Sequence, residues 1–150
     1  MKLKVVLMVI VIIVALLSSR LYMLGNQSQE VIPDLGHQNG QLAACPDKPN
    51  CVSSQEQGEA FVQPFDKNLT VKELKKSVLS IKGAKLEKEG EGYLRFSFKS
   101  DIFGFVDDLE LVKGGQAWHI RSSSRVGYSD MNANRERVEK LRQLIMKNIN

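Results

Sequence analysis

The sequence predicts an α+β domain preceded by an N-terminal membrane helix. An apolar run fills most of the first 25 residues, and two later segments space their apolar residues as helices do. The segments between them alternate apolar and polar side chains, which is typical of strands. We expect an antiparallel sheet of about four strands with two helices packed on one face, or alternatively a curled, barrel-like sheet. The length of 150 residues fits one such domain.

Residues 1–25 are expected to form a signal anchor or a signal peptide. Residues 5–17 carry no polar side-chain atom, and residues 5–24 are long enough to cross a bilayer. Lysines before the apolar run favour a cytoplasmic start and an outward-facing remainder. A cleavage site is poorly formed, because leucine lies three positions before cuts after Ser18 or Ser19. An uncleaved single-pass anchor in the bacterial inner membrane is therefore favoured over a cleaved signal peptide, with the C-terminal domain in the periplasm.

Residues 26–44 are polar and contain glycine and glutamine, so we expect a flexible stalk. Leu42–Cys45 has the form of a lipoprotein box, but its distance from the apolar run argues against lipidation. Cys45 and Cys51 enclose a loop with two prolines, and in an outward-facing domain they are expected to form a disulfide. Free thiols, or a metal or redox role, are the alternatives. The spacing is not CxxC, and two cysteines alone cannot complete a zinc site.

The folded domain is expected to span residues 45–150, with its first helix after Thr70. Thr70 and Glu73 have the spacing of a capping box, apolar residues follow at helical intervals, and Gly83 ends the helix. Strands are expected at 84–89 and 93–99, and an extended segment at 61–65 could add an edge strand. In the strand 93–99, the residues expected to face solvent are Tyr93, Arg95, Ser97 and Lys99.

Residues 102–112 and 117–125 are expected to form a hairpin closed by the two-residue loop Gly114-Gly115. A register error of one residue would move every side chain to the other face. The predicted pairs include Asp108 with Arg121, Glu110 with His119, Asp107 with Ser122, Leu109 with Ile120, and Leu111 with Trp118.

The last helix is expected over residues 133–147, with Asn132 or Asp130 as its N-cap. Arg135 and Arg137 lie in its first turn, where the helix dipole disfavours cations. Helix stability does not explain this placement. It indicates that both side chains have a tertiary or ligand partner.

The net charge of +4 does not indicate a nucleic-acid-binding protein. Lys2, Lys4 and Arg20 belong to the N-terminal segment, which leaves 18 basic and 17 acidic residues elsewhere. What remains is an electropositive C-terminal end, because residues 120–150 contain seven basic and three acidic side chains.

The segment 121–137 has an unusual density of hydrogen-bonding side chains, including four arginines. Arginine offers five donors and no acceptor, so these side chains require anionic or carbonyl partners. The partner could be an anionic ligand, or the cluster could be an internal network of ion pairs and caps. On this basis Arg125, Arg135 and Arg137 lack an obvious internal partner. The candidate ligand-binding residues are Asp107, Asp108, Glu110, Arg121, Ser122, Ser124, Arg125, Asp130, Asn134, Arg135 and Arg137.

Catalytic, cofactor and metal sites are not predicted. Ser122–Ser124 with His119 and Glu110 could be drawn as a hydrolase site, but His119 and Ser122 point to opposite faces of one strand. A cation site built from the acidic candidates is disfavoured, because adjacent strand residues do not converge.

Three segments carry a family resemblance. CPDKPNCVSS at 45–54, FGFVDDLE at 103–110 and RSSSRVGYSDMNANRERVEKLR at 121–142 resemble the signature blocks of Domain of Unknown Function 1499, found in bacteria and plastids. The resemblance covers roughly residues 42–147, although Met131–Ala133 replaces a glycine-containing spacer. It implies no mechanism, because the family has no established activity.

We therefore expect a membrane-anchored, outward-facing module, held through residues 5–24, that binds an anionic ligand or a protein partner in envelope assembly or maintenance. The ligand could be a lipid headgroup, an envelope polymer or a membrane protein. The alternatives are a structural accessory subunit without a ligand and an enzyme of unknown type, such as a hydrolase.

Overall fold

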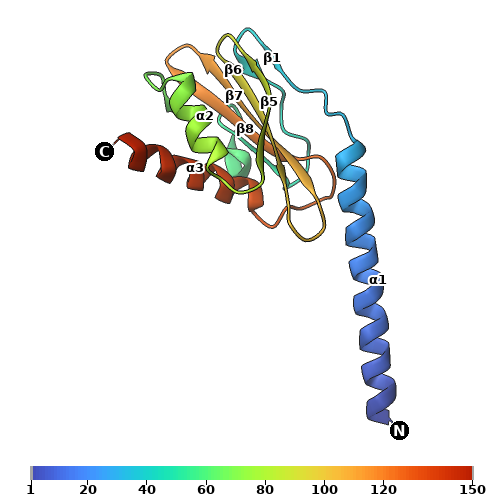
Figure 1. The fold of residues 1–150 in the computed structure, drawn as a ribbon. Helices are drawn as coiled ribbons and strands as arrows, with labels where there is room; N and C mark the ends of the chain where they lie inside the picture. Colours follow the sequence, from blue (N-terminus) through green and yellow to red (C-terminus); the bar gives the residue numbers. More distant parts are fainter. Residues whose placement is uncertain (1, 150) are drawn as a thin grey trace.

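The computed structural model describes residues 2–149, in which a long N-terminal helix leads into a layered α+β domain (Figure 1). The first helix, α1, is long and apolar enough to cross a membrane, a property that membrane anchors share with signal sequences. The elements are α1 (Lys2–Glu30), β1 (His37–Gln38), β2 (Gln41–Leu42), β3 (Cys51–Ser53), the 3-10 helix η1 (Gly58–Ala60), β4 (Phe65–Asp66), α2 (Val71–Leu79), β5 (Ala84–Gly90), β6 (Tyr93–Lys99), β7 (Val106–Gly114), β8 (Ala117–Ser124) and α3 (Ala133–Ile149).

The main sheet is antiparallel and six-stranded, in the order β3-β8-β7-β6-β5, with β4 also pairing with β8. The predicted α+β class and antiparallel sheet are confirmed. The sheet has more strands than we expected, because β3 and β4 are too short to show an alternating pattern. Helices α2 and α3 lie on one face of it (Figure 1).

Helix α2 begins as the capping box predicts. The Thr70 side chain accepts a hydrogen bond from the Glu73 backbone N–H, and the Glu73 carboxylate accepts one from the Thr70 backbone N–H at 2.8 Å. Gly83 follows the helix with φ of 84°, and a Cβ at this position would lie 2.7 Å from the Lys99 carbonyl oxygen. Glycine is therefore required both by its backbone angle and by the approach of β6.

The hydrophobic core fills the layer between the sheet and the two helices. Trp118 lies at its centre, and its indole N–H donates to the Leu69 carbonyl at 2.9 Å. The fully buried members of this core are Leu74, Val78, Leu94, Phe96, Leu109, Leu111, Ile120, Val138 and Leu141.

The β7–β8 register differs from the predicted one by two residues. Gly114 pairs with Ala117 and remains in the ladder, so the loop consists of Gly115 and Gln116. Gly114 is needed for close packing, because a Cβ there would lie 3.3 Å from the Gly40 carbonyl oxygen and 3.1 Å from His119. A shift of two residues keeps every side chain on its predicted face but changes its partner. Glu110 therefore lies opposite Arg121, and Asp108 opposite Ser123.

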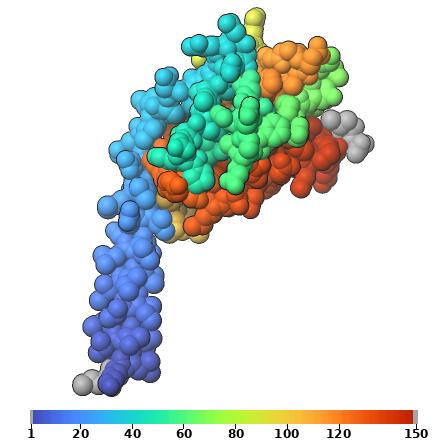
Figure 2. Space-filling model, turned by 180° about the vertical axis from the view of Figure 1, so that it is seen from behind, coloured from blue at the N-terminus to red at the C-terminus, as the bar shows by residue number. Residues whose placement is uncertain are grey.

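The second face of the sheet, which we expected to be open to solvent along the strand 93–99, is partly covered. Lys99 is exposed as expected and Arg95 is half-buried, but Tyr93 and Ser97 are buried. Tyr93 is only 4% exposed and Ser97 only 8%. Tyr93 packs with Leu42 and Val112, because the β1–β2 hairpin lies over this end of the sheet. The interval 26–44, expected to be a stalk, thus continues α1 to Glu30 and then runs against the domain. Figure 2 shows this segment and the following residues, light blue to teal, spread over the molecule from behind.

Candidate functional site

Apart from Arg135, the candidate residues fall into two networks on opposite faces of the sheet, because consecutive residues of β7 and β8 point in opposite directions. We call them the helix-side network and the outer-face network. The helix-side network comprises Asp107, Ser122, Ser124, Asp130, Asn134 and Arg137. The outer-face network comprises Tyr93, Asp108, Glu110, Arg121, Ser123 and Arg125.

Asn134 is the centre of the helix-side network and is completely buried. Its side-chain amide N–H groups donate to the Asn50 carbonyl at 3.0 Å, to Ser124 Oγ at 3.1 Å and to Asp130 Oδ2 at 2.7 Å. Its carbonyl oxygen accepts from the Ser122 hydroxyl at 2.7 Å. One side chain of α3 therefore joins the end of β8, the disulfide loop and the start of its own helix.

Arg137 is a cation in the first turn of α3, and its contacts explain why it is tolerated there. Its guanidinium lies 2.6 Å from Asp107 Oδ2 and donates to Ser122 Oγ at 3.0 Å. The same group stacks over the Phe98 ring, with its central carbon 4.5 Å from the ring centroid. A charge-assisted pair and a cation–π contact together outweigh the weak dipole penalty.

Asp130 supplies the side-chain cap of α3. Its carboxylate accepts from the backbone N–H groups of Asn132, at 3.1 Å, and Asn134, at 2.8 Å. Met131 and Asn132 both have positive φ, at 53° and 69°, so the chain turns sharply between the capping carboxylate and the helix. Of the two predicted N-caps, Asp130 therefore provides the hydrogen bonds of the cap.

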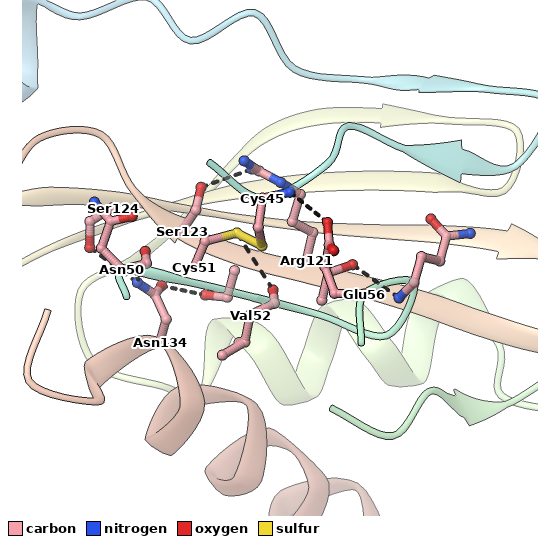
Figure 3. The surroundings of a disulfide bond; sticks show 12 residues. Cys45, Asn50, Cys51, Val52, Glu56, Arg121, Ser123, Ser124 and Asn134 are labelled. Carbon is pink, nitrogen blue, oxygen red and sulfur yellow. Dashed lines mark hydrogen bonds between the residues drawn. A yellow bond between two sulfur atoms is a disulfide. The ribbon is translucent and has the colours of Figure 1, made fainter. Parts of the chain in front are cut away.

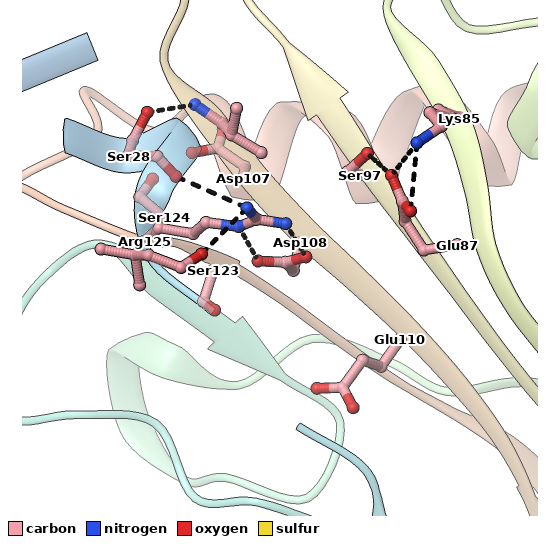
Figure 4. A network of polar contacts seen from close by, with 12 residues as sticks. Ser28, Lys85, Glu87, Ser97, Asp107, Asp108, Glu110, Ser123, Ser124 and Arg125 are labelled. Atoms are coloured by element: carbon pink, nitrogen blue, oxygen red, sulfur yellow. Dashed lines mark hydrogen bonds and ion pairs between the residues drawn. The ribbon is translucent and has the colours of Figure 1, made fainter. Parts of the chain in front are cut away.

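Arg125 and Asp108 form a two-pronged ion pair in the outer-face network (Figure 4). The guanidinium donates through Nε at 2.6 Å and through Nη2 at 2.9 Å, and Asp108 is only 1% exposed. The hydrogen bonds to Asp108 raise the pKa of Arg125 above its ordinary value. The remaining Nη1 donates to the carbonyls of Ser28, at 3.4 Å, and Val31, at 3.2 Å. Arg125 thus connects β7 to the C-terminal end of α1.

Glu110 and Arg121 form the deepest pair of the outer face. Glu110 is completely buried and accepts from the Tyr93 hydroxyl at 2.7 Å, while the Arg121 guanidinium lies 3.5 Å away and donates to Ser123 Oγ at 2.8 Å. Burial raises the pKa of Glu110, and the Tyr93 and Arg121 contacts offset only part of that effect. Within residues 2–149, the buried Nε of Arg121 has no hydrogen-bond partner.

The raised pKa of Glu110 gives a pH prediction. The folded state binds a proton at Glu110 more tightly than the unfolded state, so the contribution of this group to stability rises as the pH falls through the raised pKa towards the ordinary value of 4.5. We expect the free energy of unfolding of the wild type, relative to that of Glu110→Gln, to increase between pH 7.5 and pH 5. Denaturant titrations of both proteins at several pH values measure the difference. A difference that stays constant or shrinks would contradict the prediction.

The expectation that Arg125, Arg135 and Arg137 lack internal partners is wrong. Arg125 pairs with Asp108, and Arg137 pairs with Asp107. Arg135 donates to the Glu59 carbonyl and, at 3.0 Å, to the Phe61 carbonyl. The carbonyl partners of Arg135 belong to main chain that is distant in sequence, so no charge pattern could reveal them.

A cleft of about 480 Å³ opens beside these networks. One wall is the loop closed by the Cys45–Cys51 disulfide, which confirms the predicted pairing; Figure 3 shows the bond beside β8. Tyr128, which is 71% exposed, lies on the lining. The lining residues are Pro46, Asp47, Lys48, Pro49, Cys51, Val52, Glu59, Ala60, Tyr128, Asp130, Asn132 and Arg135.

The cleft contains only part of the predicted site. Asp130 and Arg135 line it, whereas the other candidate residues lie in the two networks beneath or behind it. Asp47, Lys48 and Tyr128 also line the cleft, although they were not among the predicted site residues. Two features of the sequence could have indicated these lining residues: the loop between the cysteines, which contains two prolines, and the tyrosine that follows Gly127.

His119 and Ser122, considered for hydrolysis, do not meet. His119 Nδ1 lies 3.3 Å from Ser54 Oγ on the outer face, whereas Ser122 lies in the helix-side network. Within the described part of the chain, no group of three or more histidine, cysteine, aspartate or glutamate residues is placed to hold a metal ion.

Comparison with protein families matches residues 41–145 to the sequence model described as "Protein of unknown function (DUF1499)". That interval contains the sheet, the disulfide, both networks and the cleft, and it covers more than half of the chain. Comparisons with curated proteins and with solved structures give no match. The chain belongs to the DUF1499 family of proteins of unknown function.

Proposed function

We propose that this protein is a membrane-anchored, periplasmic binding module whose cleft receives a segment of a protein partner in envelope assembly or maintenance. In this proposal α1 is an uncleaved anchor in the bacterial inner membrane, and its length and hydropathy support that role. Among the ligands expected from the sequence, a protein partner is favoured over an anionic lipid headgroup or an anionic envelope polymer.

The observation that carries the proposal is the composition of the cleft. Its exposed charged side chains are of both signs, Asp47 and Lys48 on the disulfide loop and Glu59 opposite. Arg135, the cationic group nearest the start of α3, is already bound to main-chain carbonyls. An anion site gathers cationic donors, whereas here carboxylates accompany the exposed lysine. An exposed tyrosine with polar groups around it resembles the aromatic centre and polar rim of a protein interface.

The walls of the cleft are also prepared for binding. The disulfide and two prolines restrict the loop 45–51 before any partner arrives. From the same loop, the Asn50 side chain donates to the Gly127 carbonyl at 3.0 Å and fixes the turn that presents Tyr128. A pre-ordered surface loses less conformational entropy on association, which favours affinity without a large interface.

Site-specific photo-crosslinking in intact cells tests the proposal. We expect a photoreactive phenylalanine in place of Tyr128 to give a discrete protein adduct. Reversing the loop charges with Asp47→Lys and Lys48→Asp should lower its yield several-fold, because the side chains would then repel their partners.

The matched probe replaces Glu91, an exposed residue in the β5–β6 turn at the other end of the sheet. Equal adducts from both positions, or none from Tyr128, would contradict a specific protein-binding cleft. An adduct to phospholipid alone would favour the lipid headgroup that the sequence left open.

A further inference from the structure

The end of α1 is seated directly on the domain at the β6–β7 turn. A Cβ added to Gly25 would lie 1.8 Å from the Phe103 carbonyl oxygen, so the two backbones are in contact. Three residues on, the Ser28 hydroxyl donates to the Gly25 carbonyl at 2.6 Å and accepts from the Val106 backbone N–H at 2.9 Å. Gly25 and Ser28 are both buried. The helix and the sheet therefore share a packed joint.

Two cationic side chains hold this joint from the domain side. Arg125 donates to the carbonyls of Ser28 and Val31, where the helix dipole is negative. Lys99 Nζ donates to Gln29 Oε1 at 2.8 Å. Figure 4 shows Arg125 reaching from Asp108 to Ser28 at the end of α1. These contacts fix the orientation of the domain relative to α1.

The joint places the β6–β7 turn at the level where α1 leaves the apolar layer. Residues 5–24 span about 30 Å as a helix, which matches the hydrocarbon core of a bilayer. Gly25 follows immediately and contacts Phe103, so residues 101–104 lie at the headgroup level. Figure 1 shows this turn descending beside α1.

The turn has the composition of a membrane contact. Ile102 is 83% exposed, although it is one of the most apolar side chains of the domain, and Phe103 beside it is only partly buried. The adjacent Asp101 is paired with Lys82 Nζ at 2.5 Å, which reduces the cost of bringing the carboxylate towards a membrane surface. Within the described residues, nothing in the domain covers Ile102.

We propose that the β6–β7 turn is a second membrane contact, in which Ile102 inserts into the interface of the leaflet from which α1 emerges. The inference rests on the proposed role of α1 as a retained anchor. It goes further, because it makes the domain lie on the membrane in one orientation rather than hang from a stalk.

The test uses the full chain reconstituted into phospholipid vesicles with brominated acyl chains. Ile102→Trp adds one fluorophore to the buried Trp118, and Glu91→Trp adds one at the opposite end of the sheet as the control. We expect the added emission of Ile102→Trp to be blue-shifted and quenched by the brominated lipid, and that of Glu91→Trp to be neither. Quenching equal to that of the control would overturn the proposal.

A second variant separates insertion from simple proximity to the vesicle. Gly25→Val in the Ile102→Trp background forces the joint apart through the Phe103 contact, so quenching should be lost while the protein still floats with the vesicles. Quenching that persists would show that the joint does not position the turn. If no variant floats with the vesicles, α1 is not a membrane anchor and this proposal fails. The crosslink from Tyr128 tests the cleft independently of that result.

Discussion

Replacing Arg125 with alanine is expected to lower the free energy of unfolding by about 3–5 kcal/mol, a large share of the stability of a domain of this size. Asp108 is almost fully buried, and both of its oxygens accept from Arg125. Without the guanidinium the buried carboxylate loses the ion-pair partner that both of its oxygens contact. Denaturant unfolding, followed by the fluorescence of Trp118, measures the loss.

Lys75→Ala provides the matched control. Lys75 pairs with Glu89 at 2.8 Å, but the two side chains are 34% and 40% exposed. Solvent screens such a pair, so the expected change is no more than about 1 kcal/mol. The double variant Asp108→Leu with Arg125→Met should recover much of the loss, because it removes both charges together. A loss for Arg125→Ala as small as that of Lys75→Ala would mean that the pair is not structural.

Local chemistry allowed much of the fold to be predicted. The Thr70 capping box specifies where α2 begins, because two hydrogen bonds satisfy backbone groups within four residues. The faces of β7 and β8 follow from the alternation of apolar and polar residues over 108–111 and 118–121, and they survive a register error of two residues. The Cys45–Cys51 disulfide could be predicted from the expected oxidising compartment and the short spacing of the two cysteines alone.

What could not be predicted depends on contacts distant in sequence. The polar residues of β6 and β7 alternate as if they faced water, and only the chain that covers them shows that Glu110 and Asp108 are buried. The covering segment is itself polar, and its hairpin strands have two residues each, so nothing in it has the period of a strand. Burial by a polar segment leaves no hydrophobic pattern in the sequence.

The candidate site shows the same limit. The density of donors in the segment 121–137 correctly indicated a need for partners, and Asp107 and Asp108 supply two of them. Glu110 supplies a third, for Arg121. The acceptors that no sequence pattern indicates are the main-chain carbonyls of Ser28, Val31, Glu59 and Phe61, groups that every sequence contains. Asn134 and Arg135 contact the disulfide loop and the segment around η1, which border the cleft, and only Asp130 and Arg135 of the candidate residues line it.

Asn134→Ala is expected to cost about 2–4 kcal/mol of unfolding free energy, although alanine is the better helix former. The change deprives the Ser122 hydroxyl of its acceptor and Ser124 Oγ of its donor in the region beneath α3. The Asn50 carbonyl loses one donor but keeps the Ser124 backbone N–H. Each unsatisfied group costs on the order of 1 kcal/mol or more. Because Asn50 adjoins Cys51 and also fixes Gly127, the crosslink from position 128 should weaken in the same variant.

Asn148→Ala is the control for this prediction, because it removes the same chemical group from the same helix. Its side chain makes a single, partly buried hydrogen bond to Ser77 Oγ at 3.2 Å, so a loss of about 1 kcal/mol or less is expected. If Asn134→Ala costs no more than this, water replaces the amide and the network does not fix α3 to the sheet. If it costs more but leaves the crosslink unchanged, the network stabilises the fold without shaping the cleft, and the two walls are ordered by the disulfide loop and the Asp130 cap alone.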